Sequence, residues 1–177
     1  GSAKTNISAG DACMRTAFQS DETPVRAANF QQAIGYYHNT LRITPKWLHA
    51  AKRIGEAYYE LAKLSDSLST TGNEALARQL LPAWPTQAPR QRTILLLDST
   101  LKYDTARHNA WCNLGHMKKA EGDTAAARYA YEKALGYRSD TAAYWYNLGA
   151  LHFQGQRVAQ SFRYFEEAER LAPNNIH

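Results

Sequence analysis

One helical pattern occurs twice in the last third of this sequence at a fixed spacing. The segment Trp-Cys-Asn-Leu-Gly at residues 111–115 returns 34 residues later as Trp-Tyr-Asn-Leu-Gly at residues 145–149. Three further positions keep this offset: Ala127, Tyr131 and Ala134 return as Ser161, Phe165 and Ala168. Apolar residues three and four apart share one face of a helix, and the small residues allow two helices to approach closely. Each copy therefore predicts a helical hairpin, and hairpins of this kind must stack to bury both of their apolar faces.

The 34-residue period, with Trp, Leu-Gly, Ala and an aromatic residue at these offsets, resembles the tetratricopeptide repeat (TPR) family. The resemblance implies an all-α fold, a right-handed α-α superhelix (a TPR-like solenoid) of about four helical hairpins. We expect a weakly patterned N-terminal helical hairpin over 8–45 and a TPR-like hairpin over 46–105, with an insertion at about 69–89. Two regular TPR hairpins should follow, over 106–139 and 140–173.

The expected insertion lies between two repeat signals. Gly55 precedes Gly115 by 60 residues, which is 26 more than one period, so we interpret the segment as one enlarged repeat. Three prolines in the insertion favour an extended or turning course around Trp84. Long loops in compact arrays are often functional, so Trp84 either faces a partner or anchors the insertion on the helices beneath it. In the first case, deleting residues 69–89 should leave melting intact.

Composition limits the function classes. The net charge of +5 is spread along the chain without a basic block, which argues against a nucleic-acid interface. No apolar run approaches the ~20 residues of a membrane span. Cys13 and Cys112 lie far apart, so two free thiols in a reducing compartment are expected, with a disulfide as the alternative. The sequence does not fix the location: free thiols slightly favour the cytoplasm, and a periplasmic location would require that a signal peptide has been removed from a longer parent protein.

No catalytic constellation is present. The sequence has no Gly-rich phosphate loop, no nucleophile elbow and no zinc-protease motif, so we expect neither an enzyme nor a cofactor. Cys112 and His116 stand four residues apart, a spacing that two metal ligands can use, but no third ligand lies at a recognisable spacing. We therefore expect no metal site.

The TPR resemblance implies that the first helix of each hairpin lines a concave groove in which peptides bind. Our candidates for peptide binding are Lys52, Arg53, Asn113, His116, Lys119, Tyr146 and Asn147, with Trp84 as a partner-facing residue of the insertion. The helical wheel also places Tyr59, Glu60, Cys112 and Phe153 on the outward side. Asn113 and Asn147 match the Asn ladder that some TPR proteins use to hold a peptide backbone, although Arg53 replaces the preceding rung. Glu56, where chaperone-binding TPR domains need Asn, argues against a carboxylate clamp.

These observations predict a non-catalytic protein–protein interaction module that binds an extended peptide or partner segment, with the lysines favouring acidic residues in it. The alternative is a structural or oligomerisation segment of a larger protein that uses its end faces and the Pro-rich insertion. A homo-oligomer would then form through the C-terminal edge.

Overall fold

The computed structural model describes residues 1–80 and 89–173, which fold into helices and connecting turns with no strand among them. The chain divides into two compact units, Gly1–Thr105 (unit 1) and Ala106–His177 (unit 2). The expected all-α, TPR-like fold of helical hairpins is confirmed. Within the described residues, no helix combines the length and apolarity needed to cross a bilayer.

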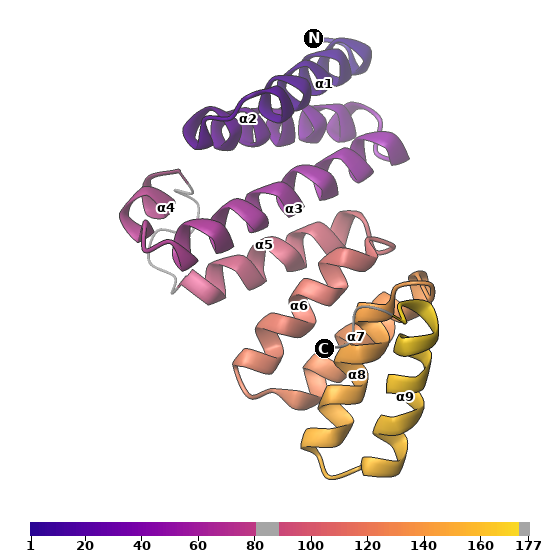
Figure 1. The fold of residues 1–177 in the computed structure, drawn as a ribbon. Helices are drawn as coiled ribbons and strands as arrows, with labels where there is room; N and C mark the ends of the chain where they lie inside the picture. Colours follow the sequence, from indigo (N-terminus) through magenta and orange to yellow (C-terminus); the bar gives the residue numbers. More distant parts are fainter. Residues whose placement is uncertain (81–88, 174–177) are drawn as a thin grey trace. The chain divides into compact units, whose positions relative to one another are not determined.

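Unit 1 begins with a hairpin of two long helices, α1 (Ala3–Gln19) and α2 (Thr23–Ile43) (Figure 1). Ser2 caps α1 by accepting a hydrogen bond from the Thr5 amide, and a proline lies in the first turn of α2, where its missing N–H costs nothing. The third helix, α3 (Leu48–Thr70), packs against α2 and against α5 (Pro89–Tyr103). It is therefore buried on two sides.

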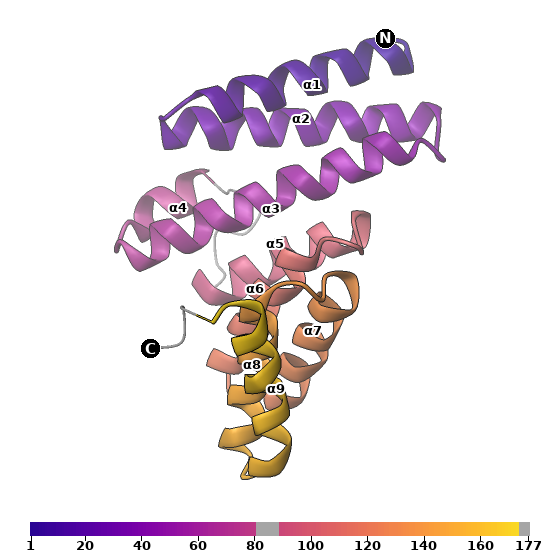
Figure 2. The ribbon, with the colours of Figure 1, turned by 45° about the vertical axis from the view of Figure 1, so that its right-hand side comes forward.

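The described part of the expected insertion belongs to the core of unit 1. Helix α3 continues to Thr70, and a short helix, α4 (Glu74–Leu80), then packs against α3 and α2 (Figure 2). Ala77 is fully buried, and Glu74 forms an ion pair with the fully buried Arg92 of α5. Because these contacts would be lost, we now expect deletion of 69–89 to reduce the stability of unit 1. Trp84 lies outside the described residues.

Unit 2 consists of two regular hairpins. Helices α6 (His108–Ala120) and α7 (Thr124–Tyr137) form the first, and α8 (Ala142–Gln154) and α9 (Val158–Leu171) form the second. Helix α7 also packs against α8, so the two hairpins share a core. The buried members of that core are Cys112, Ala127, Tyr131, Ala134, Tyr144, Leu148 and Leu151.

A glycine-to-aromatic contact sets the approach of the two helices in three hairpins. A Cβ added at Gly115 would lie 2.5 Å from the Tyr131 ring, and one added at Gly149 would lie 2.7 Å from the Phe165 ring. The predicted close approach at these glycines is confirmed. Unit 1 repeats the contact, since a Cβ at Gly10 would lie 2.6 Å from the ring of Tyr37. Only a glycine leaves room for the ring at these positions.

Candidate functional site

The structure distributes the predicted peptide-binding residues over both units. Lys52 and Arg53 lie on α3 of unit 1, while the other five lie on α6 and α8 of unit 2. Two of those five are in direct contact, because the Asn147 amide nitrogen lies 3.5 Å from His116 Nε2. This contact joins the first helices of the two hairpins of unit 2.

Three residues expected on the outward side are buried instead. Tyr59 and Glu60 are each only 7% exposed, because α3 packs against other helices on two sides. Cys112 is also 7% exposed and belongs to the core of unit 2. A helical wheel identifies the face that packs within one hairpin, but it does not predict burial against a neighbouring hairpin.

His116 is the centre of a polar cluster in unit 2. Its Nδ1 lies 3.0 Å from the hydroxyl oxygen of Tyr131, and its Nε2 lies 3.5 Å from Cys112 Sγ. The Asn147 amide approaches both the imidazole and the thiol, at 3.5 and 3.7 Å. The cluster therefore connects residues of three helices, α6, α7 and α8.

The electrostatics of this cluster do not fit nucleophilic catalysis. Burial raises the pKa of the Cys112 thiol to about 11, against a small opposing effect of the Asn147 hydrogen bond. Burial, helped by the charge of Lys119, lowers the pKa of His116 from its ordinary value. Both groups are consequently neutral at pH 7, whereas an activated cysteine requires a thiolate. No group of three or more metal-ligating side chains occurs in the described part of the chain.

Arg53 of unit 1 is bound to two carboxylates. Its guanidinium donates to Glu56 at 2.7 Å and to Asp11 of α1 at 3.2 Å. Asp11 also accepts a 2.6 Å hydrogen bond from the hydroxyl of the buried Tyr37. These two ion pairs neutralise the Arg53 charge within unit 1. The neighbouring Lys52 is exposed. Glu56, whose charge is unfavourable for a carboxylate clamp, forms an ion pair with Arg53 one helical turn away.

The Asp11 and His116 clusters occupy equivalent positions, and sequence reasoning missed this. Each residue directly follows the glycine of its own hairpin and bonds the tyrosine hydroxyl on that hairpin's second helix. Each also contacts the residue two positions before the glycine of the next hairpin within its unit, Arg53 for Asp11 and Asn147 for His116. We call Asp11 and His116 the linking residues.

The last hairpin shows what sequence signal could have revealed the link. There Ala150 follows Gly149, and the aromatic residue is Phe165. A polar residue after the glycine therefore occurs with tyrosine, and alanine occurs with phenylalanine, which has no hydroxyl to bond. In the two hairpins that have tyrosine, the residue after the glycine bonds its hydroxyl.

Helix α8 adds an exposed aromatic surface beside the cluster. Tyr146 is 48% exposed and Phe153 is 59% exposed, and their spacing of seven residues places them on one side of the helix, two turns apart. The Tyr146 ring lies against that of Phe165, with centroids 5.5 Å apart. Asn113 and Lys119 of α6 are half-buried. Amide, cationic and aromatic groups therefore occur together on the first helices of unit 2.

Comparisons with known proteins agree with this fold. Residues 112–176 match the family model of the tetratricopeptide repeat. No curated protein matches the chain. Among solved structures, a crystal structure of MamA is 17% identical, with 81% of this chain and 89% of that one covered at a TM-score of 0.48. MamA from Desulfovibrio magneticus RS-1 is 14% identical, with 99% and 97% covered at 0.47. The family match alone shows that the chain carries tetratricopeptide repeats, in residues 112–176 of its second unit.

Proposed function

We propose that this chain is a non-catalytic protein-interaction module in which the first helices of unit 2 bind an extended segment of a protein partner. Tetratricopeptide repeats generally serve protein–protein interaction and are typically non-enzymatic, which supports the broader part of the proposal. The observation that carries the finer part is that α8 exposes Tyr146 and Phe153 and also carries Asn147, whose amide contacts His116 of α6. Aromatic side chains beside polar groups are typical of protein-binding surfaces.

The chemistry of Asn147 suits a peptide backbone. An asparagine side chain offers one acceptor and two donors, so it can pair with the C=O and the N–H of an extended strand. The present contacts of the Asn147 amide, at 3.5 and 3.7 Å, are at or beyond the length of a good hydrogen bond. A peptide can therefore replace them at little cost. Asn113 stands one repeat earlier at the equivalent position.

The remaining candidates fall into two groups. Lys119 is placed on the same helix as Asn113 and favours acidic residues in the ligand, while Tyr146 and Phe153 supply apolar contact. Arg53 differs, since its charge is bound by Asp11 and Glu56. We assign Arg53 to the stability of unit 1, and Lys52, although it is exposed on the same unit, lies outside the surface proposed for unit 2.

Peptide selection tests the proposal and requires no identified partner. The 177-residue chain would be used to select binders from a displayed random-peptide library, and the affinity of each binder would be measured by calorimetry. Asn113→Ala with Asn147→Ala should weaken binding by about 1–3 kcal/mol, because each net hydrogen bond is worth about 0.5–1.5 kcal/mol. Asn39→Ala, at an exposed position of unit 1, is the matched control. Equal affinity of the double variant and wild type would rule out this surface.

A second candidate function is self-association through α9. This helix exposes Val158 (44%) and Phe162 (61%), one turn apart, a pattern that favours contact with another apolar surface. Sedimentation velocity over a range of concentrations should then show a dimer that Phe162→Ser abolishes. A monomer at every concentration would exclude this candidate.

A further inference from the structure

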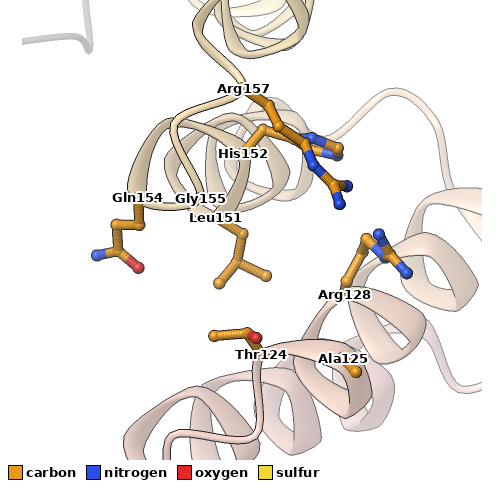
Figure 3. Close-up of a pocket in the computed structure, with 8 residues that line it drawn as sticks. All are labelled: Thr124, Ala125, Arg128, Leu151, His152, Gln154, Gly155 and Arg157. Atoms are coloured by element: carbon orange, nitrogen blue, oxygen red, sulfur yellow. The ribbon is translucent and has the colours of Figure 1, made fainter.

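A cavity in unit 2 lies between the first part of α7 and the turn that joins α8 to α9 (Figure 3). Its volume is about 330 Å³. It is lined by Thr124, Ala125, Arg128, Leu151, His152, Gln154, Gly155 and Arg157. None of the eight predicted site residues is among them.

The cavity brings two positive charges together. Figure 3 shows the guanidinium groups of Arg128, from α7, and Arg157, from the turn before α9, pointing toward one another. No acidic residue is among the described residues that line the cavity. Arg157 forms no ion pair within the described ranges, and the ion pair of Arg128 with Glu132 is long, at 3.8 Å, and exposed. Facing like charges are unfavourable unless an anion lies between them.

A buried histidine with no hydrogen-bond partner lines the same cavity. His152 is only 9% exposed, and both of its ring nitrogens are buried without a partner in the described part of the chain. One face of the imidazole stacks on Tyr164, with centroids 5.0 Å apart and planes 19° apart. Leaving a buried polar group unpaired costs free energy, so such a group indicates a partner that comes from elsewhere.

We infer that this cavity binds an oxyanion, a phosphate or carboxylate group, between Arg128, Arg157 and His152. The planar guanidinium groups match the geometry of phosphate and carboxylate oxygens, and a ring N–H of His152 supplies a further donor. The other residues that line the cavity carry no opposing charge. The cavity volume accommodates the anion together with part of the residue that carries it. This site is separate from the proposed peptide surface and does not depend on it.

Titration with inorganic phosphate at constant ionic strength tests the site in the 177-residue chain. The side-chain signals of Arg128, Arg157 and His152 in nitrogen-detected NMR spectra should shift and saturate together. Arg128→Gln and Arg157→Gln should each weaken phosphate binding by about tenfold, because each removes one charge-assisted hydrogen-bonding group. Arg128→Lys should restore part of the affinity. His152→Phe, which can keep the stacking on Tyr164, should also weaken binding.

Arg170→Gln is the matched control, since it removes the same charge near the other end of α9. Affinity should be unchanged in this variant and in Asn113→Ala with Asn147→Ala, which separates this site from the peptide surface. Two short peptides, one with phosphoserine and one with glutamate, then identify which oxyanion source is preferred. Saturation by either supports the site. Shifts that never saturate, or that are equal in wild type, Arg128→Gln and Arg170→Gln, would overturn it.

Discussion

The two units connect their helices with different chemistry. In unit 1, ion pairs join residues of different helices, as in Asp11 with Arg53, Arg26 with Glu60, and Arg92 with Glu74. In unit 2, the ion pairs Lys118–Glu121, Arg128–Glu132, Arg138–Asp140 and Arg170–Glu167 each join positions no more than four apart in sequence. Contacts between hairpins there are apolar or neutral, through the shared core and the bond of His116 with Asn147.

The linking residues of the two units have the same position and the same hydrogen-bond partner, but they differ in charge. Asp11 and His116 occupy the same position after a glycine and bond the same tyrosine hydroxyl, yet one link is ionic and the other neutral. The glycine-to-aromatic contact fixes the hairpin, so the polar link can vary. In unit 1, Asp11 neutralises the Arg53 charge. In unit 2, His116 makes only a long contact with Asn147. This difference supports assigning peptide binding to unit 2.

The largest expected effect tests whether the glycine contact is equivalent in the two units. Gly10→Leu and Gly115→Leu should each destabilise by about 3 kcal/mol, the upper end of the usual cost of overpacking, because the added Cβ would lie 2.6 or 2.5 Å from a buried ring. Gly149→Leu should behave alike, and so should leucine at the buried positions Ala134 and Ala168. Urea denaturation measures the change.

Gly35→Ala is the control for that series, because nothing lies within 4 Å of an added Cβ in the middle of α2. It should stabilise by about 0.5–1 kcal/mol through helix propensity. If leucine at Gly10 left the stability unchanged while leucine at Gly115 did not, the proposed equivalence of the two hairpins would be wrong.

The second prediction concerns the ionic character of unit 1. Glu74→Gln should destabilise by about 2 kcal/mol, because it removes a carboxylate from the fully buried Arg92. The figure is below the ~3–5 kcal/mol of an enclosed pair, since Glu74 is partly exposed. Glu132→Gln, at an exposed ion pair of unit 2, should change stability by less than about 1 kcal/mol. Equal melting temperatures for the two variants would remove the contrast between the units.

Turns provide a third, smaller test. Gly72 in unit 1 and Gly122 in unit 2 have left-handed backbones, with φ of 76° and 81°, but the corresponding turn of the last hairpin has Gln156 at 59°. A side chain in this conformation costs about 1 kcal/mol. Gln156→Gly should therefore raise the stability by up to about that amount, and Gly122→Ala should lower it. A loss of stability in Gln156→Gly by thermal melting would show that the strain is offset by contacts of the glutamine side chain.

Acid should weaken the His116 cluster of unit 2 and the Glu74–Arg92 ion pair of unit 1 at different pH. Burial lowers the pKa of His116 in the fold, so the unfolded chain takes up the proton first, and stability falls as pH decreases from the ordinary value of 6.5 toward the folded pKa. The hydrogen bond from Arg92 lowers the pKa of Glu74, so its contribution is present above 4.5 and is lost as pH falls through the folded value. His116→Gln should reduce the loss of melting temperature between pH 7 and pH 5. An unchanged slope would mean that other histidines account for it.

The regular part of the fold could be predicted from the sequence because its spacing is constant. Gly115 and Gly149 each precede their aromatic partner by 16 residues, but Gly10 precedes Tyr37 by 27. Helices α1 and α2 have 17 and 21 residues, against 13 and 14 in α6 and α7, so the first hairpin keeps the contact but loses the spacing. The sequence therefore predicts the hairpin over 8–45 from its apolar pattern, but the 34-residue period does not reveal its glycine-to-aromatic contact.

The site was less predictable because it depends on contacts between hairpins. No sequence pattern relates Asn147 to His116, and only the structure shows that they touch. The helical wheel places Cys112 outward, although Cys112 belongs to the same buried core as Tyr144 and Leu148 of α8. Arg128 and Arg157 carry no sequence signal, since 29 residues separate them and no motif includes them. Residues from neighbouring hairpins form these sites, and a single repeat cannot show this.

The central claim is that peptide binding belongs to unit 2 and that Arg53 of unit 1 serves the fold. The most direct measurement is an NMR titration of the full chain with a selected peptide, following the side-chain amide signals of Asn113 and Asn147 and the Arg53 Nε–H signal together. We expect both asparagine signals to shift and saturate with the peptide's affinity while the Arg53 signal remains in place. A shift of Arg53 with unchanged asparagine signals would contradict the account.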